Sequence, residues 1–135
     1  MKTFRIFILL FAILFCQCSS SEIGKYNYEQ LDNTAKEKFT KNYNITFNKN
    51  QTYAICLKRV KTSPPMPSPP LNFFIYDIKN EKIIYQSSLA NGRVSWKNNE
   101  QVEIETIPGT VTGFEPPDAF KNIYDVRQQK ILEKK

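Results

Sequence analysis

The sequence contains no histidine, and among its 135 residues there are only three cysteines and four glycines. The absence of histidine excludes Ser-His-Asp and Cys-His catalysis, and it removes the histidine ligands of most catalytic zinc sites. The glycines stand at positions 24, 92, 109 and 113, too far apart to form a phosphate-binding loop. The side chains that remain available for a catalytic or binding site are carboxylates, lysines and serines.

The chain also lacks an apolar run long enough to cross a membrane as a helix. The longest run, residues 6–15, follows the positive charges of Lys2 and Arg5. A spanning helix needs about 20 apolar residues, because each adds about 1.5 Å and the bilayer core is about 30 Å thick. Small and polar residues follow at once. Residues 1–17 are therefore predicted to be a signal peptide, which makes this an exported protein.

The signal region ends in two cysteines, Cys16 and Cys18. A cysteine directly after the apolar run resembles the lipid-attachment site of bacterial lipoproteins. In that family the cysteine becomes the first residue of the mature protein and carries a diacylglyceryl group on its sulfur. We assign lipidation to Cys18, because the bulky Phe15 would lie beside the cleaved bond if Cys16 were used. The resemblance implies a lipid anchor in a bacterial membrane, with the outer membrane preferred, and residues 18–26 as a tether.

Ordinary signal cleavage is the alternative. Ser19 and Ser21 are small residues two apart, as are Cys18 and Ser20, and either pair fits a signal-peptidase site. Cleavage there would release a soluble secreted protein. Lipidation of the Cys18 sulfur would thus give an anchored mature protein, and ordinary cleavage would give a soluble one.

The mature chain, residues 18–135, has room for one domain. Without Lys2 and Arg5 it carries 17 Lys and Arg against 13 Asp and Glu, a net charge of +4. The positive residues are scattered along the sequence, so nucleic acid is not an expected partner. Cys56 is the single thiol left after maturation. It is predicted to be a small buried hydrophobe rather than half of a disulfide.

Residues 27–41 have helical periodicity. Tyr28, Leu31, Ala35 and Phe39 fall on one side of a helix. The apolar stripe is narrow, so the helix needs a surface to dock on. We expect it to cover one end of a sheet; a position on a membrane surface is the alternative.

From residue 43 onward the apolar spacing changes to the period of two that is typical of strands. Hairpins are predicted around turns at residues 80–81 and 98–99, and a short strand over 110–114. Residues 122–133 fit both a strand and a helix, with the strand favoured. Residues 43–135 are therefore predicted to form a small β-domain. The expected fold class is mainly β, an antiparallel β-sandwich or open barrel with one N-terminal helix after the signal peptide.

Five of the seven residues 64–70 are proline, so residues 62–70 are predicted to form a stiff loop outside the sheets. Phe73 and Phe74 follow this loop on one strand, where neighbouring side chains point to opposite faces. One of the two should face solvent unless both faces of the sheet are covered. An exposed aromatic beside the loop is a candidate partner site. The predicted binding residues are Pro65, Met66, Pro67, Phe73 and Phe74.

The sequence offers no motif for a catalytic, cofactor or metal site. Glu103 and Glu105 share a strand face, but a solvated outer face is favoured over glycosidase-type pairing. Asp77, Glu81 and Asp118 lack the spacing of a calcium loop. We expect a non-enzymatic binding or structural module of the cell envelope, with the membrane and an envelope protein as partners. An inhibitor or immunity-type envelope protein is one alternative, and a carboxylate-dependent hydrolase is a less favoured one.

Overall fold

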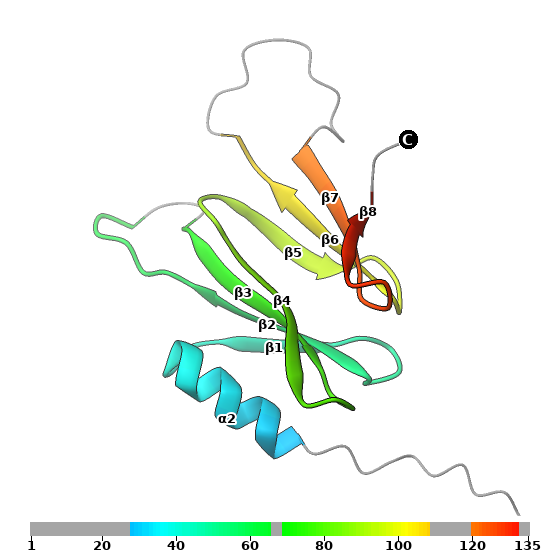
Figure 1. Cartoon of the computed structure of the whole chain (residues 1–135). Helices are drawn as coiled ribbons and strands as arrows, with labels where there is room; N and C mark the ends of the chain where they lie inside the picture. The colour runs from blue at the N-terminus through cyan, green and yellow to red at the C-terminus, as the bar shows by residue number, and fades with distance from the viewer. Residues whose placement is uncertain (1–27, 66–68, 109–119, 133–135) are drawn as a thin grey trace, which may run out of the picture.

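The computed structural model of the chain describes residues 28–65, 69–108 and 120–132. These residues form one helix and two four-stranded antiparallel sheets, stacked in three layers (Figure 1). Among them there is no helix long and apolar enough to cross a membrane. Several predictions from the sequence lie outside the described residues: the signal peptide, Cys16, Cys18, the tether and the strand over 110–114.

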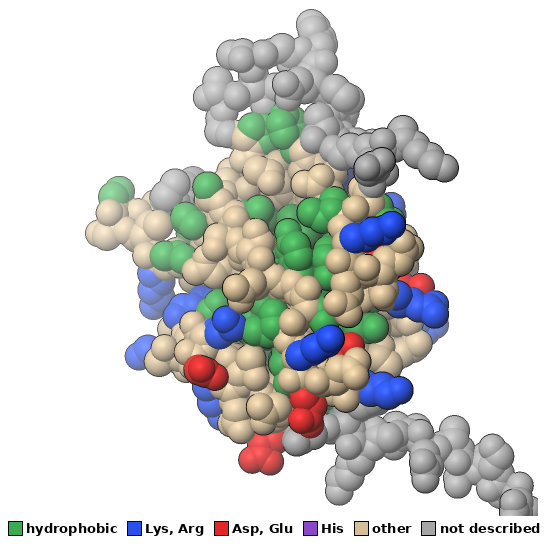
Figure 2. Space-filling model, in the orientation of Figure 1, with side chains coloured by type: hydrophobic (Ala, Val, Ile, Leu, Met, Phe, Trp, Pro, Cys, Tyr) green, Lys and Arg blue, Asp and Glu red, His purple; other side chains and the backbone are tan. Residues whose placement is uncertain are grey.

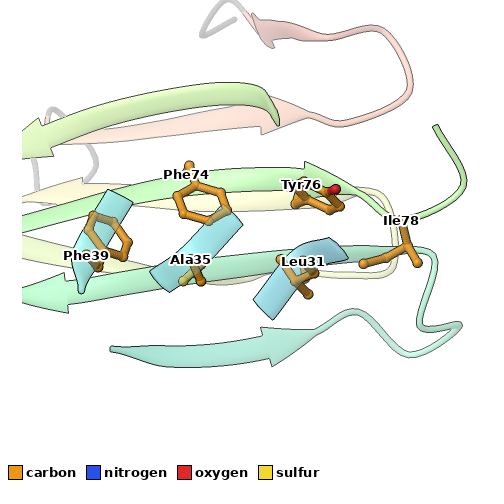
Figure 3. Packing of buried hydrophobic residues seen from close by; sticks show 8 residues of the cluster. Leu31, Ala35, Phe39, Phe74, Tyr76 and Ile78 are labelled. Atoms are coloured by element: carbon orange, nitrogen blue, oxygen red, sulfur yellow. The ribbon is translucent and has the colours of Figure 1, made fainter. Parts of the chain in front are cut away.

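Helix α2 (Tyr28–Phe39) lies where the helical periodicity predicts it. Its buried residues Leu31, Ala35 and Phe39 are spaced by four, so they form a single stripe along one side. This stripe packs against Phe74 and Tyr76 of the first sheet (Figure 3). The helix lies across a face of that sheet rather than over one end, because its apolar stripe runs the whole length of the helix.

The first sheet contains strands β1 to β4 in chain order, each antiparallel to its neighbour. The four strands are β1 (Asn44–Phe47), β2 (Tyr53–Arg59), β3 (Leu71–Asp77) and β4 (Lys82–Leu89). The hairpin predicted around residues 80–81 is confirmed as β3 and β4. All but one of the residues of β3 are buried, because α2 covers one face of the sheet and the second sheet covers the other.

The second sheet continues the same simple up-and-down order. Its strands are β5 (Gly92–Trp96), β6 (Gln101–Thr106), β7 (Lys121–Asp125) and β8 (Lys130–Leu132). The hairpin predicted around residues 98–99 is confirmed as β5 and β6. In the ambiguous segment, the described residues 122–132 contain most of β7, a turn and β8. The Asp125 carboxylate fixes this turn by accepting hydrogen bonds from the backbone N–H groups of Arg127 and Gln128 at 3.0 and 2.8 Å.

Two apolar cores hold the three layers together. One lies between α2 and the first sheet, and the other lies between the sheets, where Ile55, Phe73 and Ile75 meet Val102 and Tyr124. The Tyr124 hydroxyl also donates a hydrogen bond to the Ile84 carbonyl across the sheets, at 3.0 Å. The predicted mainly-β class is confirmed: the sheets form a small β-sandwich and do not close into a barrel.

Neither Phe73 nor Phe74 faces solvent, because both faces of the sheet are covered, which is the exception that the sequence prediction named. Phe73 is 2% exposed and points into the core between the sheets, and Phe74 is 1% exposed and points toward α2. The two side chains do alternate, but both faces of β3 are covered. Neither ring is therefore available to a partner.

Candidate functional site

Among the predicted binding residues, the structure leaves Pro65 at the surface. Phe73 and Phe74 belong to the two cores, and Met66 and Pro67 lie outside the described residues. The region around the base of the proline-rich loop nevertheless contains two adjoining hollows.

The first hollow lies at the base of the loop and has a volume of about 280 Å³. Val60 follows directly after β2, is 37% exposed and contributes an apolar wall together with Pro65 and Pro69. Val60 is held in place because its backbone N–H donates a 2.7 Å hydrogen bond to the Pro70 carbonyl. We call this the apolar hollow. Its lining residues are Arg59, Val60, Lys61, Thr62, Pro65 and Pro69.

The second hollow, which we call the basic groove, has a volume of about 410 Å³ and lies at the C-terminal end of α2. Its neutral lining residues are Phe39, Asn42, Val60 and Asn72. Five positively charged residues line it: Lys38, Lys41, Lys58, Arg59 and Lys61. Figure 2 shows blue side chains gathered on the left flank of the molecule, over the end of α2 and the neighbouring end of β2.

The end of α2 forms one wall of the basic groove. Thr40 and Asn42 both adopt left-handed backbone conformations, with φ of 63° and 59°. The Thr40 N–H closes the last helical turn on the Lys36 carbonyl at 2.7 Å. This geometry stops the helix and turns the chain toward β1, as left-handed residues commonly do after a helix. It also brings Lys41 to the rim of the groove.

The floor of the groove is the part of the first sheet that the helix does not reach. Lys58 and Asn72 are register partners on β2 and β3. Lys58 lies two residues after Cys56 and Asn72 two residues before Phe74, so all four are on the same face of the sheet. The Lys58 ammonium donates a 2.6 Å hydrogen bond to the carbonyl of Phe39 at the helix end. The cation therefore complements the negative end of the helix dipole and is fixed in position.

The charges of the basic groove have no carboxylate partner among the described residues. No Asp or Glu lines the groove, and its five cations take part in none of the ion pairs found in the described part of the chain. Those pairs are Lys36–Asp32, Arg93–Glu105, Lys121–Glu103 and Arg127–Glu100. Cations gathered in a concave surface attract anions. This cluster cannot be recognised in the linear sequence, because its members come from two separate segments.

The opposite end of the sandwich contains a hollow of about 240 Å³ where two carboxylates occur, those of Asp77 and Glu100. Each already has a partner. Asp77 accepts hydrogen bonds from the backbone and side chain of Asn80 at 3.0 and 2.7 Å, and Glu100 pairs with Arg127 at 3.0 Å. These bonds hold turns, and the hollow does not bring two unpaired carboxylates together.

The other candidate acids are also dispersed. Glu103 and Glu105 pair with Lys121 and Arg93 on the outside of the second sheet. In the part of the chain that the structure describes, no three Asp, Glu or Cys side chains are grouped as metal ligands. Asp118 lies outside the described residues. The geometry thus offers a binding surface at the basic groove.

Cys56 is buried between the first sheet and α2, as predicted. Burial, with a smaller contribution from the negative charge of Asp32, raises the pKa of the Cys56 thiol to about 12. The thiol therefore stays protonated at neutral pH, and the nucleophilic thiolate is scarce.

We expect a chain with Cys16→Ser and Cys18→Ser to react with a thiol reagent at pH 8 about a thousandfold more slowly when folded than in urea. The physical reasons are the raised pKa and the buried position of Cys56. Time courses of labelling with a chromogenic disulfide reagent measure both rates. Equal rates in the presence and absence of urea would contradict the buried placement.

No protein-family model, curated protein or solved structure matches this chain. The basic groove and the apolar hollow are therefore interpreted from their own geometry and charge.

Proposed function

We propose that this protein is an exported envelope lipoprotein, anchored through Cys18, whose folded domain is a non-enzymatic binding module. The observation that carries the binding role is the basic groove, in which five cations face one open hollow with no carboxylate partner among the described residues. Pairing these charges with carboxylates would add little to the stability of the fold, since exposed ion pairs stabilise a fold only slightly. Without such partners, the charges are available for association with an anionic partner.

The position of the groove relative to α2 agrees with a tethered arrangement. The proposed tether ends shortly before Tyr28, the first residue of α2, while the basic groove lies beyond Phe39, the last. A helix of 12 residues is about 18 Å long. The binding surface and the tether attachment therefore lie at opposite ends of the helix, and an anchored domain keeps the groove accessible.

Replacing Cys18 by serine tests the anchor. We expect a Cys18→Ser chain to lose incorporation of a labelled palmitate, because the sulfur that accepts the diacylglyceryl group is gone. A Cys16→Ser chain should keep the label and stay in the membrane fraction, since two or more acyl chains give stable anchoring. Metabolic labelling followed by cell fractionation measures both. Labelling that persists in the Cys18→Ser chain would rule out this anchor.

A further inference from the structure

We infer that the basic groove and the apolar hollow together bind an acidic polypeptide segment of an envelope partner, with its carboxylates in the groove and a neighbouring apolar side chain in the hollow. This inference rests on the proposed binding role and names the chemistry of the partner.

The two hollows are one continuous surface. Arg59, Val60 and Lys61 line both of them, so a bound chain that leaves the groove passes directly over Val60 into the apolar hollow. The charged part accepts anions, and the adjoining part offers exposed Val60 and Pro65 to apolar groups. A ligand that satisfies both must be acidic at one position and apolar at the next.

Two cations of the groove are already positioned before a ligand arrives. The Lys58 ammonium is bound to the Phe39 carbonyl, and the Lys38 ammonium donates to the Gln86 side-chain oxygen at 3.0 Å. An ammonium has three donors, so each keeps donors for a carboxylate. A positioned donor loses less side-chain entropy on binding than a freely moving one. Lys41 and Lys61 are exposed at the rim, where they can attract an acidic segment from solution.

The shape and composition of the surface favour a polypeptide over other anions. The cations line a concave groove, whereas a bilayer presents its headgroups as a nearly flat surface. The single aromatic residue lining the groove is Phe39, which is 8% exposed and so offers no platform for stacking bases. Apolar side chains next to acidic ones are common in proteins, and they fit both halves of the site.

The test is a selection from a library of short random peptides on the full chain, purified in a neutral detergent. We expect the enriched peptides to carry Asp or Glu next to an apolar residue. The dissociation constant of the best peptide, measured by fluorescence polarisation, should rise about tenfold in the Lys41→Glu/Lys61→Glu chain and also with added salt. Both side chains are exposed, so the variant should keep the melting temperature of the wild type.

A charge-matched control separates the groove from general attraction. Lys49→Glu/Lys97→Glu changes the net charge by the same amount in two turns away from the groove, and we expect it to leave the dissociation constant within about twofold of the wild-type value. Val60→Ser should weaken binding about threefold, since it removes apolar surface from the hollow.

Three results would overturn the inference: no enrichment of acidic residues, equal weakening by both charge-reversed chains, or displacement of the peptide by phosphatidylglycerol vesicles, which would indicate a lipid site. Lipid labelling of Cys18 is measured separately. If the peptide does not bind but anchoring still depends on Cys18, the inference about the acidic partner is wrong and the proposed lipid anchor stands.

Discussion

Replacing Phe74 by alanine is expected to lower the free energy of unfolding by about 3–5 kcal/mol. The Phe74 ring is 1% exposed, and its centroid lies 5.5 Å from that of Phe39 on α2 and 6.4 Å from that of Tyr76 on the same strand. The truncation removes buried apolar area and leaves a cavity that neither the sheet nor the helix can close without separating. A loss of this size is a large part of the 5–15 kcal/mol that is typical of a folded domain.

Urea unfolding can measure this loss through the fluorescence of Trp96, the only tryptophan in the chain. Its indole N–H donates to the Thr46 carbonyl at 3.1 Å, so its emission should change when the two sheets separate. Phe47→Ala is the matched control. Phe47 is 39% exposed and has an edge contact with Tyr28 at a centroid distance of 5.3 Å, so its loss should cost about 1 kcal/mol or less. Similar losses at the two positions would contradict the core assignment.

Replacing Gly92 by alanine is expected to lower the free energy of unfolding by about 2–3 kcal/mol. Gly92 is buried at the start of β5, directly after the turn that joins the two sheets. A Cβ atom at this position would overlap the backbone carbonyl oxygen of Glu105 on β6 and crowd Leu89. The overlap is with backbone, which cannot rotate away, so β5 and β6 would have to move apart.

The same urea experiment measures this effect. Ser95→Ala is the matched control, because Ser95 is exposed on the same strand and should change stability by no more than about 0.5 kcal/mol. A Gly92→Ala chain as stable as the Ser95→Ala chain would show that the close approach of β5 to β6 is not needed for the fold.

Much of the secondary structure could be predicted from the sequence, because it depends on local periodicity. The spacing of Leu31, Ala35 and Phe39 predicts α2, and two β-hairpins follow from alternating apolar residues around turns at 80–81 and 98–99. The spacing in segment 122–133 fits both a strand and a helix, because the turn held by Asp125 leaves strands too short to show a clear period.

The accessibility of Phe73 and Phe74 could not be predicted in the same way. Strand alternation places the two rings on opposite faces of β3, but it does not say what lies over each face. Helix α2 covers one face and the second sheet covers the other, and both contacts join residues that are distant in the sequence.

The candidate site likewise depends partly on local sequence and partly on tertiary packing. Local spacing in the sequence predicts the helix, two of the hairpins and many apolar residues of the cores, and residues 6–15 with Cys18 lead to the expectation of export. Local spacing could not place Lys38 and Lys41 next to Lys58, Arg59 and Lys61, because the two groups lie in separate segments, at the end of α2 and at the end of β2. Docking of α2 on the first sheet brings them together, and that docking is driven by burial of the apolar stripe of the helix. The basic groove thus forms through tertiary packing, because the apolar contacts between α2 and the first sheet bring its charged residues together.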